Sequence, residues 1–468
     1  MKRFRLCGWL PLFLALAATG SLAAEDPSIT SLQEEVRLLR ARLDVLERKL
    51  AEASTNLPLA SPTAMAPPAA PAAPPATLPL LVPELSSSGL SIGRAGGAYM
   101  NMSFDVLANA GWASTPDVKS IQPGGHDPSQ RGVSLRNAEI ALDGAVDPYF
   151  KGFANIVMFT EPDESTGIEL EEAYVLTTSL PEDLQLKAGR FFAEFGRMNS
   201  QHPHTWAFAD MPLVLNRMFG EDGLRQNGAR ISWLVPTPNY TEVMLGVFNG
   251  QGSDAFSFRY PGEPDALGIP RFYGRATTNR ALNALGDLLF VPRLTSSFDL
   301  TEEQTLVLGA SAAIGPNDTS DHARTLIYGA DAFWKWKPVD AEGGWPFVTW
   351  QTEVLGRNFQ TGADPVAALP AENLHDWGYY SQVQWGFEPR WVLGLRGEYV
   401  AGDHSASADA NEERLTERRV STDITFFPTE FSKLRLQYNH TWRESLPDEN
   451  AVWLQLEFML GSHAAHKY

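Results

Sequence analysis

The chain of 468 residues contains a single cysteine, Cys7, which lies in an N-terminal segment that we expect to be removed. The mature chain then has no thiol, which excludes disulfides, cysteine–metal sites and thiol catalysis. Positive charge is also scarce, with 37 Lys and Arg against 56 Asp and Glu and a net charge of −19. Because nucleic acids are bound through clustered Lys and Arg, this balance argues against a nucleic-acid partner.

Long apolar runs are absent except at the start of the chain. There, basic residues precede the apolar segment 6–16 and the small-residue cleavage site 21–23. This order predicts a signal peptide over residues 1–23. An uncleaved helical anchor is the alternative, but the run is too short to span a bilayer comfortably. The negative mean hydropathy of the chain excludes a bundle of transmembrane helices.

The first mature segment, 24–53, has a strict heptad pattern that predicts a coiled coil. Positions a hold Ile29, Val36, Leu43 and Leu50, and positions d hold Leu32, Leu39, Leu46 and Ala53. The run from Arg42 through Leu43 and Leu46 to Glu47 resembles the motif of short parallel trimeric coiled coils, in which Arg–Glu contacts cover the apolar seam. We therefore expect a homotrimer. An amphipathic helix packed on its own chain is the alternative, although such helices usually have a wider apolar stripe.

Residues 54–89 are rich in Pro and Ala, which predicts an extended linker without a core. Coil and linker together would act as a spacer or as a tether to cell-wall material. A remnant without a partner is the alternative.

Residues 90–468 contain sixteen segments, mostly of ten or more residues and with period-two alternation. They lie near 98–112, 132–145, 150–160, 168–179, 184–198, 226–235, 240–250, 288–299, 304–314, 325–337, 346–358, 375–387, 390–401, 415–427, 432–443 and 450–461. Short and long connections alternate between them. This pattern predicts an all-β fold, a 16-stranded antiparallel transmembrane β-barrel in outer-membrane lipid. An even strand number places both ends, and hence the N-terminal segment, in the periplasm.

The last segment shows the alternation clearly. Its expected outward row is Val452, Leu454, Leu456, Phe458 and Leu460, and polar residues lie between them. A soluble sandwich or propeller is the competing β fold. Aromatic residues near segment ends and the many polar inward rows favour the membrane barrel, because a sandwich would bury those polar groups at high cost.

The inward rows give a mixed set of pore-lining candidates. The basic candidates are Arg230, Arg293, Lys335, Arg396, Arg419 and Arg435, and the acidic candidates are Glu139, Glu169 and Glu171. Acids dominate the early strands and bases the later ones, which predicts a transverse field across the lumen. Paired charges that merely fill the wall are the alternative.

The long connection 199–225 is the candidate constriction. Its acids Asp210, Glu221 and Asp222 are expected to face basic side chains such as Arg396, Arg419 and Arg435. The pair His202 and His204 has metal-ligand character but lacks a carboxylate partner in the sequence, so we predict no metal and no cofactor.

The segments 137–144, 189–191, 195–197 and 461–468 resemble bacterial outer-membrane porins of the phosphate-selective porin O/P-like superfamily. The resemblance implies a porin, and it implies that Phe458 and the terminal Tyr468 form the barrel-insertion signal. The phosphate-selective members line their pore with arginines and lysines, whereas the inward set here is mixed. We therefore expect passive diffusion of ions and small polar solutes, with phosphate or anion selectivity as the alternative.

Two other classes lack their sequence signals. Nothing resembles a TonB box followed by a plug domain, which argues against energised uptake. No Ser/His/Asn constellation stands out on an outward face, so an enzyme is not expected.

Overall fold

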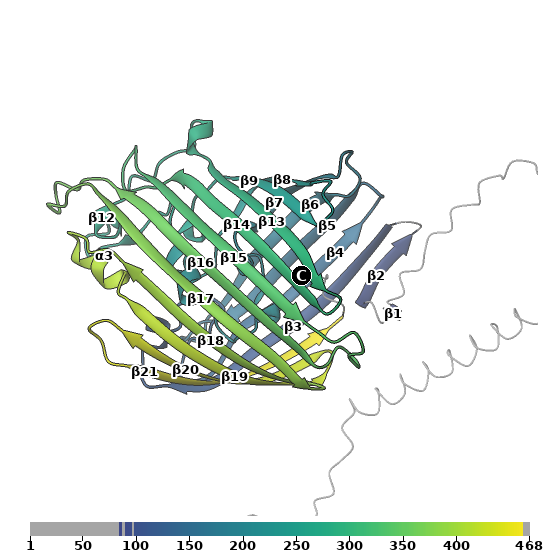
Figure 1. The fold of residues 1–468 in the computed structure, drawn as a ribbon. Coiled ribbons are helices and arrows are strands. Elements are labelled where there is room, and N and C mark those ends of the chain that lie inside the picture. The colour runs from purple at the N-terminus through teal and green to yellow at the C-terminus, as the bar shows by residue number, and fades with distance from the viewer. Residues whose placement is uncertain (1–83, 87–88, 96–97, 462–468) are drawn as a thin grey trace, which may run out of the picture. The chain divides into compact units, whose positions relative to one another are not determined.

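A computed structural model gives the fold of the chain (Figure 1). The structure describes residues 84–86, 89–95 and 98–461. The predicted signal peptide (1–23), the predicted coiled coil (24–53), most of the predicted linker (54–89) and Tyr468 lie outside the described residues. These parts of the sequence analysis remain predictions.

Sixteen antiparallel strands in the described residues form a closed β-barrel, which confirms the predicted fold class. The strands are β3 (Ala98–Ala113), β4 (Gly132–Ala145), β5 (Phe150–Thr160), β6 (Thr166–Thr177), β7 (Leu184–Phe192), β8 (Arg225–Leu234), β9 (Thr241–Phe248), β13 (Leu289–Thr301), β14 (Gln304–Pro316), β15 (Arg324–Trp336), β16 (Phe347–Thr361), β17 (Glu372–Glu388), β18 (Trp391–Gly402), β19 (Glu417–Thr429), β20 (Ser432–Arg443) and β21 (Glu449–Leu460). The last strand pairs with the first, from Ala451 opposite Ala113 to Leu460 opposite Phe104, and this pairing closes the sheet.

Alternation makes the outer face of the barrel apolar and the inner face polar. In β21, the side chains of Val452, Leu454 and Leu456 are exposed on the outside, whereas Gln455 and Glu457 are buried on the inside. Successive side chains of a strand point to opposite faces of its sheet, so one row faces each side. An apolar outer row on a closed barrel is the surface that lipid contacts.

Short and long connections alternate around the barrel. The tight turns include residues with positive φ, such as Asp183 (φ 54°) and Arg390 (φ 75°), a backbone state that two-residue hairpins commonly need. The long connections are 114–131, 193–224, 249–288, 362–371 and 403–416. Because the strand number is even, β3 begins and β21 ends at the rim of the short turns.

Two short strands precede the barrel. β2 (Gly89–Ala95) pairs with the start of β3, from Leu90 opposite Met102 to Ala95 opposite Ala98. β1 (Glu84–Ser86) pairs with β2, so sheet pairing begins within the segment that we predicted as linker. Since β21 pairs with β3 only from Phe104 onward, β2 covers the part of β3 that would otherwise be an open edge.

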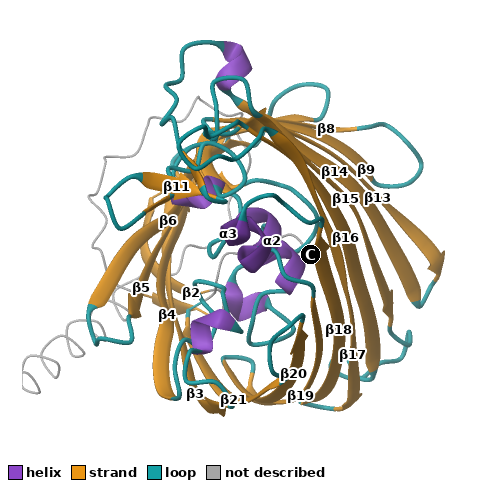
Figure 2. Ribbon diagram, turned by 90° about the vertical axis from the view of Figure 1, so that its left-hand side faces the viewer, coloured by secondary structure: helices purple, strands orange, loops and turns teal. Residues whose placement is uncertain are grey.

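The lumen and the long-loop rim carry the remaining elements. They are α2 (Leu213–Phe219), α3 (Ala408–Glu413), four 3-10 turns, and a small sheet of β10 (Glu263–Pro264), β11 (Pro270–Phe272) and β12 (Arg275–Ala276). The ribbon view shows α2 enclosed by the barrel strands (Figure 2). Among the residues that the structure describes, no helix is long and apolar enough to cross a membrane.

The main apolar core lies inside the barrel. It joins α2 and the chain around Phe195 to the inner wall, where Phe248 of β9, Val291 of β13, Ile327 of β15 and Leu355 of β16 contribute. Inward apolar residues on these strands depart from a fully polar lumen. This part of the wall therefore serves as packing surface for the loop that enters the barrel.

Candidate functional site in the barrel lumen

The connection 193–224, which we call the lumen loop, leaves β7 and returns to the neighbouring β8, but in between it reaches the far wall. The fifth predicted strand ends at Phe192 rather than near 198, because the chain turns inward at Gly196 (φ 60°). The backbone N–H of Ala209 donates to Gln437 of β20 at 2.7 Å, and the N–H of Leu213 donates to Glu398 of β18 at 2.7 Å. The loop therefore crosses the lumen.

Asp210 is the centre of the attachment to the far wall. Its carboxylate accepts hydrogen bonds from Arg396 at 2.6 Å and Arg419 at 2.9 Å, and also from Gln437 and Asn439. Burial by itself would raise the pKa of Asp210, but the two guanidinium groups and the Gln437 amide lower it to about 2. The carboxylate is therefore charged at neutral pH and holds the loop to β18, β19 and β20.

Other basic side chains of this wall bind the backbone of the lumen loop. Lys433 donates to the carbonyl oxygen of His204 at 2.8 Å, and Arg435 donates to that of Trp206 at 2.7 Å. Both are buried. The basic wall thus uses its charges to satisfy loop carbonyls as well as one carboxylate.

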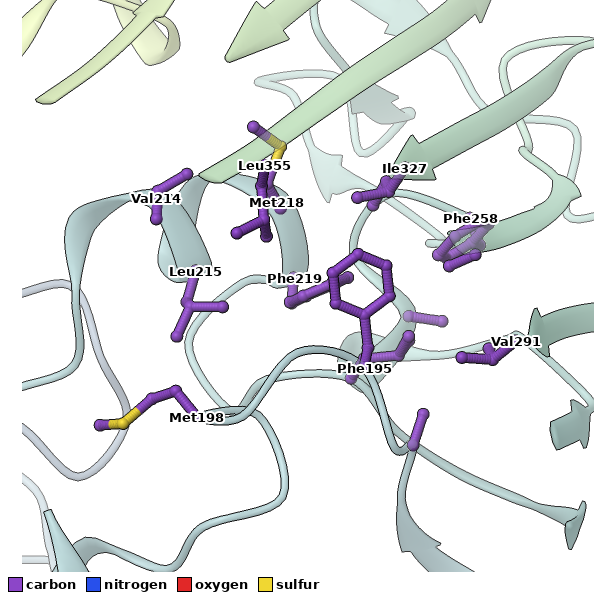
Figure 3. Packing of buried hydrophobic residues seen from close by; sticks show 14 of the residues in the cluster. Phe195, Met198, Val214, Leu215, Met218, Phe219, Phe258, Val291, Ile327 and Leu355 are labelled. Carbon is purple, nitrogen blue, oxygen red and sulfur yellow. The ribbon is translucent and has the colours of Figure 1, made fainter. Parts of the chain in front are cut away.

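The helix α2 anchors the same loop through apolar contacts. Figure 3 shows Phe195, Met218 and Phe219 among side chains of the surrounding strands, including Ile327 and Leu355. The rings of Phe195 and Phe219 lie edge to face, with centroids 5.0 Å apart. Burial of aromatic side chains dominates the packing energy of such clusters.

The first long connection, 114–131, joins the lumen loop inside the barrel. Arg419 donates to the carbonyl of Ile121, and the carboxylate of Asp127 accepts the N–H of Met211 at 2.8 Å. Burial and the nearby charge of Asp210 raise the pKa of Asp127 to about 7. Hydrogen bonds therefore connect the two loops to each other and to the basic wall.

The opposite wall, formed by β4, β5 and β6, carries acids that a β-bulge concentrates. Between Asn155 and Ile156 of β5, the pairing with β6 skips one residue, so that Asn155 faces Glu172 while Ile156 faces Leu170. The side chains of Glu171 and Glu172 are consequently both buried, although neighbours in a regular strand point to opposite faces. A second irregularity, in β4, lies near Glu139.

His202 of the lumen loop lies among these acids. Its Nε2 is 2.9 Å from Glu172, and its Nδ1 is 3.0 Å from Glu171 and 3.7 Å from Glu139. Burial would lower the pKa of His202, but the charge of Glu171 and the hydrogen bonds of the three carboxylates raise it well above its ordinary value. His126 lies 3.3 Å from Glu171 and its pKa is also raised. Imidazoles from both loops therefore face the acid wall.

The other predicted lining residues lie elsewhere on the wall. Arg230 of β8 is 3.3 Å from Glu194, and Arg293 of β13 pairs with Asp331 at 2.7 Å. Glu169 contacts Arg225, and Lys335 is exposed near the short-turn end of β15. Apart from Lys335, these charges are paired.

The expected contact of Glu221 and Asp222 with the basic wall is wrong. The carbonyl oxygen of Glu221 accepts the N–H of Gly125, and the Asp222 carboxylate also lies against Gly125. The reason is that α2 ends at Phe219 and Gly220 (φ 83°) turns the chain back toward the first long loop. Of the three acids, Asp210 alone contacts Arg396 and Arg419.

Several residues of the site were not predicted from the sequence, among them Glu172, Asn155, Arg225 and Asp127. A β-bulge adds a residue to a strand without a sequence mark, so period-two alternation through Glu169 and Glu171 does not predict an inward Glu172. The carboxylates beside His202 belong to β4 and β6, and the spacing of residues in the sequence does not reveal that these strands lie next to the loop. The metal-ligand character of His202 and His204 was the one available signal.

These features define a transmembrane β-barrel with a lumen loop held between an acid wall and a basic wall. No family model matches the chain. It is 32% identical over 378 residues to an uncharacterized protein of Aquifex aeolicus (strain VF5). The match covers 74% of this chain and 73% of that protein. The chain belongs to the same family as this Aquifex protein.

Solved structures of other proteins are similar to this one in fold. The outer membrane channel DcaP of Acinetobacter baumannii has a TM-score of 0.52 at 12% identity, and the match covers 78% of this chain and 99% of that chain. The anion-selective porin from Comamonas acidovorans has a TM-score of 0.50 at 8% identity, and the match covers 78% of this chain and all of that chain (100%). At such identities the likeness shows the barrel fold.

Proposed function

We propose that the protein is a bacterial outer-membrane porin that allows passive diffusion of ions and small polar solutes, with its N-terminal segment in the periplasm. The observation that carries this proposal is a closed sixteen-strand barrel whose lumen is crossed by a loop attached to both walls. Barrels of this strand number leave room for an aqueous channel, and an inserted loop narrows it. The two structural neighbours described above, an anion-selective porin and an outer membrane channel, agree with this function.

The pairing of the lumen charges supports weak selectivity. Arg396, Arg419 and Arg435 are buried and bind the lumen loop, so they do not form a ladder of free cations along a water-filled path. Membership of the phosphate-selective porin O/P-like superfamily, and phosphate or anion selectivity with it, is the alternative. The phosphate test below separates the two selectivities.

Planar bilayer recordings of the purified, folded protein test the proposal. We expect discrete conductance steps that rise nearly linearly with salt concentration, and little block of chloride current by millimolar phosphate. Strong block at micromolar phosphate would favour the phosphate-selective alternative. A protein that gives no conductance step would contradict porin function, provided that its heat-dependent shift in gel mobility shows that the barrel is folded.

We also propose that the protein is a homotrimer whose coiled coil tethers it to cell-wall material. The support is the heptad of residues 29–53 with the motif from Arg42 to Glu47, which lies outside the described residues. Light scattering in detergent should give the mass of three chains, and a monomer would contradict the trimer. Deletion of 24–88 should abolish co-sedimentation with isolated cell wall while conductance persists. Unchanged co-sedimentation would contradict the tether.

A further inference from the structure

Ligand-bearing side chains meet where the lumen loop contacts the acid wall. Nδ1 of His202 lies 3.0 Å from Oε2 of Glu171 and 3.7 Å from Oε2 of Glu139. The three residues come from the loop, β6 and β4, and none is more than 1% exposed. Their donor atoms lie within 4.8 Å of one another. This group is compact enough for its three donor atoms to contact one ion.

The amide of Asn155 in β5 occupies a fourth corner of this group. Its Nδ2 is 2.7 Å from Glu171, 3.2 Å from Glu139 and 3.1 Å from His202 Nδ1. In a tetrahedral site with metal–ligand bonds of 2.0–2.1 Å, the ligand atoms are about 3.3–3.4 Å apart. The five distances lie between 2.7 and 3.7 Å, on both sides of this value, so the four positions are spaced closely enough to surround one ion.

The amide also has an oxygen to offer. Asn155 is fully buried, and its Oδ1 has no hydrogen-bond partner among the described residues. A half-turn of the amide exchanges Nδ2 and Oδ1, which differ in chemistry but hardly in shape. That rotation would place an acceptor oxygen at the fourth corner, where an ion could bind it, and would move Nδ2 to the present position of Oδ1.

A further buried carboxylate lies beside the group. Asp105 of β3 forms an adjacent set with Glu139 and His204, whose donor atoms also lie within 4.8 Å of one another. Asp105 is fully buried, and within the described part of the chain neither of its carboxylate oxygens has a hydrogen-bond partner. Buried carboxylates are costly unless they are paired or coordinate a metal. A bound cation would offset this cost.

We propose that His202, Glu139, Glu171 and Asn155 bind one divalent first-row transition metal ion, which clamps the lumen loop to β4, β5 and β6. Imidazole and carboxylate together suit zinc-like ions, whereas magnesium and calcium prefer oxygen-only sites. The sequence analysis predicted no metal because the two histidines lacked a carboxylate partner, and the fold supplies two. The ion would bind at this site whether or not the barrel conducts.

Zinc binding to the folded full-length protein tests the site. The protein is stripped with a chelator, dialysed, and titrated with Zn²⁺ by calorimetry, with metal content measured after desalting. We expect one tightly bound ion per chain. His202→Gln and Glu171→Gln should each weaken binding at least about 100-fold, since even indirect contacts to a metal change affinity by 10–100-fold.

Glu353→Gln is the matched control. Glu353 is a buried glutamate of β16 that accepts the N–H groups of Arg197 and Met198, so it holds the same loop outside the cluster. This variant should keep the wild-type affinity. An equal loss in Glu353→Gln and Glu171→Gln would show general loosening and would overturn the assigned ligands.

A crystallographic measurement on the wild-type protein tests the site even if the variants fail to assemble. Crystals grown with zinc should give an anomalous difference peak within bonding distance of His202 Nδ1. Absence of zinc binding by the wild type, a peak elsewhere, or unchanged affinity in both His202→Gln and Glu171→Gln would overturn the proposal.

Discussion

The two walls that hold the lumen loop differ in how they balance charge. On the basic wall, Arg396 and Arg419 meet the carboxylate of Asp210, and Lys433 and Arg435 donate to backbone carbonyls. On the acid wall, several buried carboxylates share the imidazoles of the loops and a few cations. The cations of the first wall also pair with acids of the barrel strands, such as Glu398 and Glu457, whereas the carboxylates of the second depend on loop imidazoles and on Arg225 of β8.

The difference shows that the same loop is attached by two kinds of chemistry. Guanidinium groups have many donors, so one carboxylate and several carbonyls satisfy them. Carboxylates only accept, so the acid wall needs donors or cations from elsewhere. The acid wall is therefore the place where loss of one cation should matter most.

Arg225→Gln should give the largest loss of stability. Arg225 is fully buried and contacts Glu169, Glu171 and Asp254. Removing one partner of buried ion pairs leaves uncompensated charge and costs about 3–5 kcal/mol. We expect a lower urea midpoint in detergent with chelator present. The exposed Arg324 provides the control Arg324→Gln, and equal midpoints for both variants would show that the acid wall does not depend on Arg225.

Asp210→Asn should cost less on the basic wall. Arg396 keeps Glu398 at 2.8 Å, and Arg419 keeps the carbonyl of Ile121. Loss of charge-assisted hydrogen bonds then costs about 2–3 kcal/mol. The same unfolding measurement, with the exposed Asp340→Asn as control, should place this variant between the control and Arg225→Gln. A larger loss than in Arg225→Gln would reverse the comparison.

The double variant Glu221→Gln and Asp222→Asn should have the smallest effect, a shift of the bilayer reversal potential toward anions with little change in stability. Charges beside a narrow lumen are screened less than charges on open loops. The control is Asp403→Asn with Glu412→Gln, two exposed acids of the connection 403–416. A shift of equal size in the control would place Glu221 and Asp222 outside the ion path.

The alternating strands could be predicted from sequence because burial follows period two along most of their length. In β21 the predicted outward residues from Val452 to Leu460 are the exposed ones. The helix α2 was not predicted, since it is short and begins after Pro212 without a side-chain cap. Its apolar residues pack on wall positions that a polar-lumen pattern does not anticipate.

The site was less predictable than the fold. The pairing of Asp210 with Arg396 and Arg419 agrees with the expected facing, because loop acids and basic strands were both visible in the sequence. The cluster around His202 was not, because a bulge buries both Glu171 and Glu172 and because Asn155 and Glu139 come from separate strands. Tertiary pairing, rather than local pattern, brings these groups together.

Single-channel conductance tests the central claim that the lumen loop, attached to both walls, narrows the pore. Residues 203–219, which include Asp210 and all of α2, are replaced by a short Gly-Ser linker, and deletion of 339–344 in the turn between β15 and β16 is the control. The account predicts a larger single-channel conductance for the loop replacement, with the barrel still folded, and wild-type conductance for the control. Wild-type conductance in the folded loop replacement would contradict it.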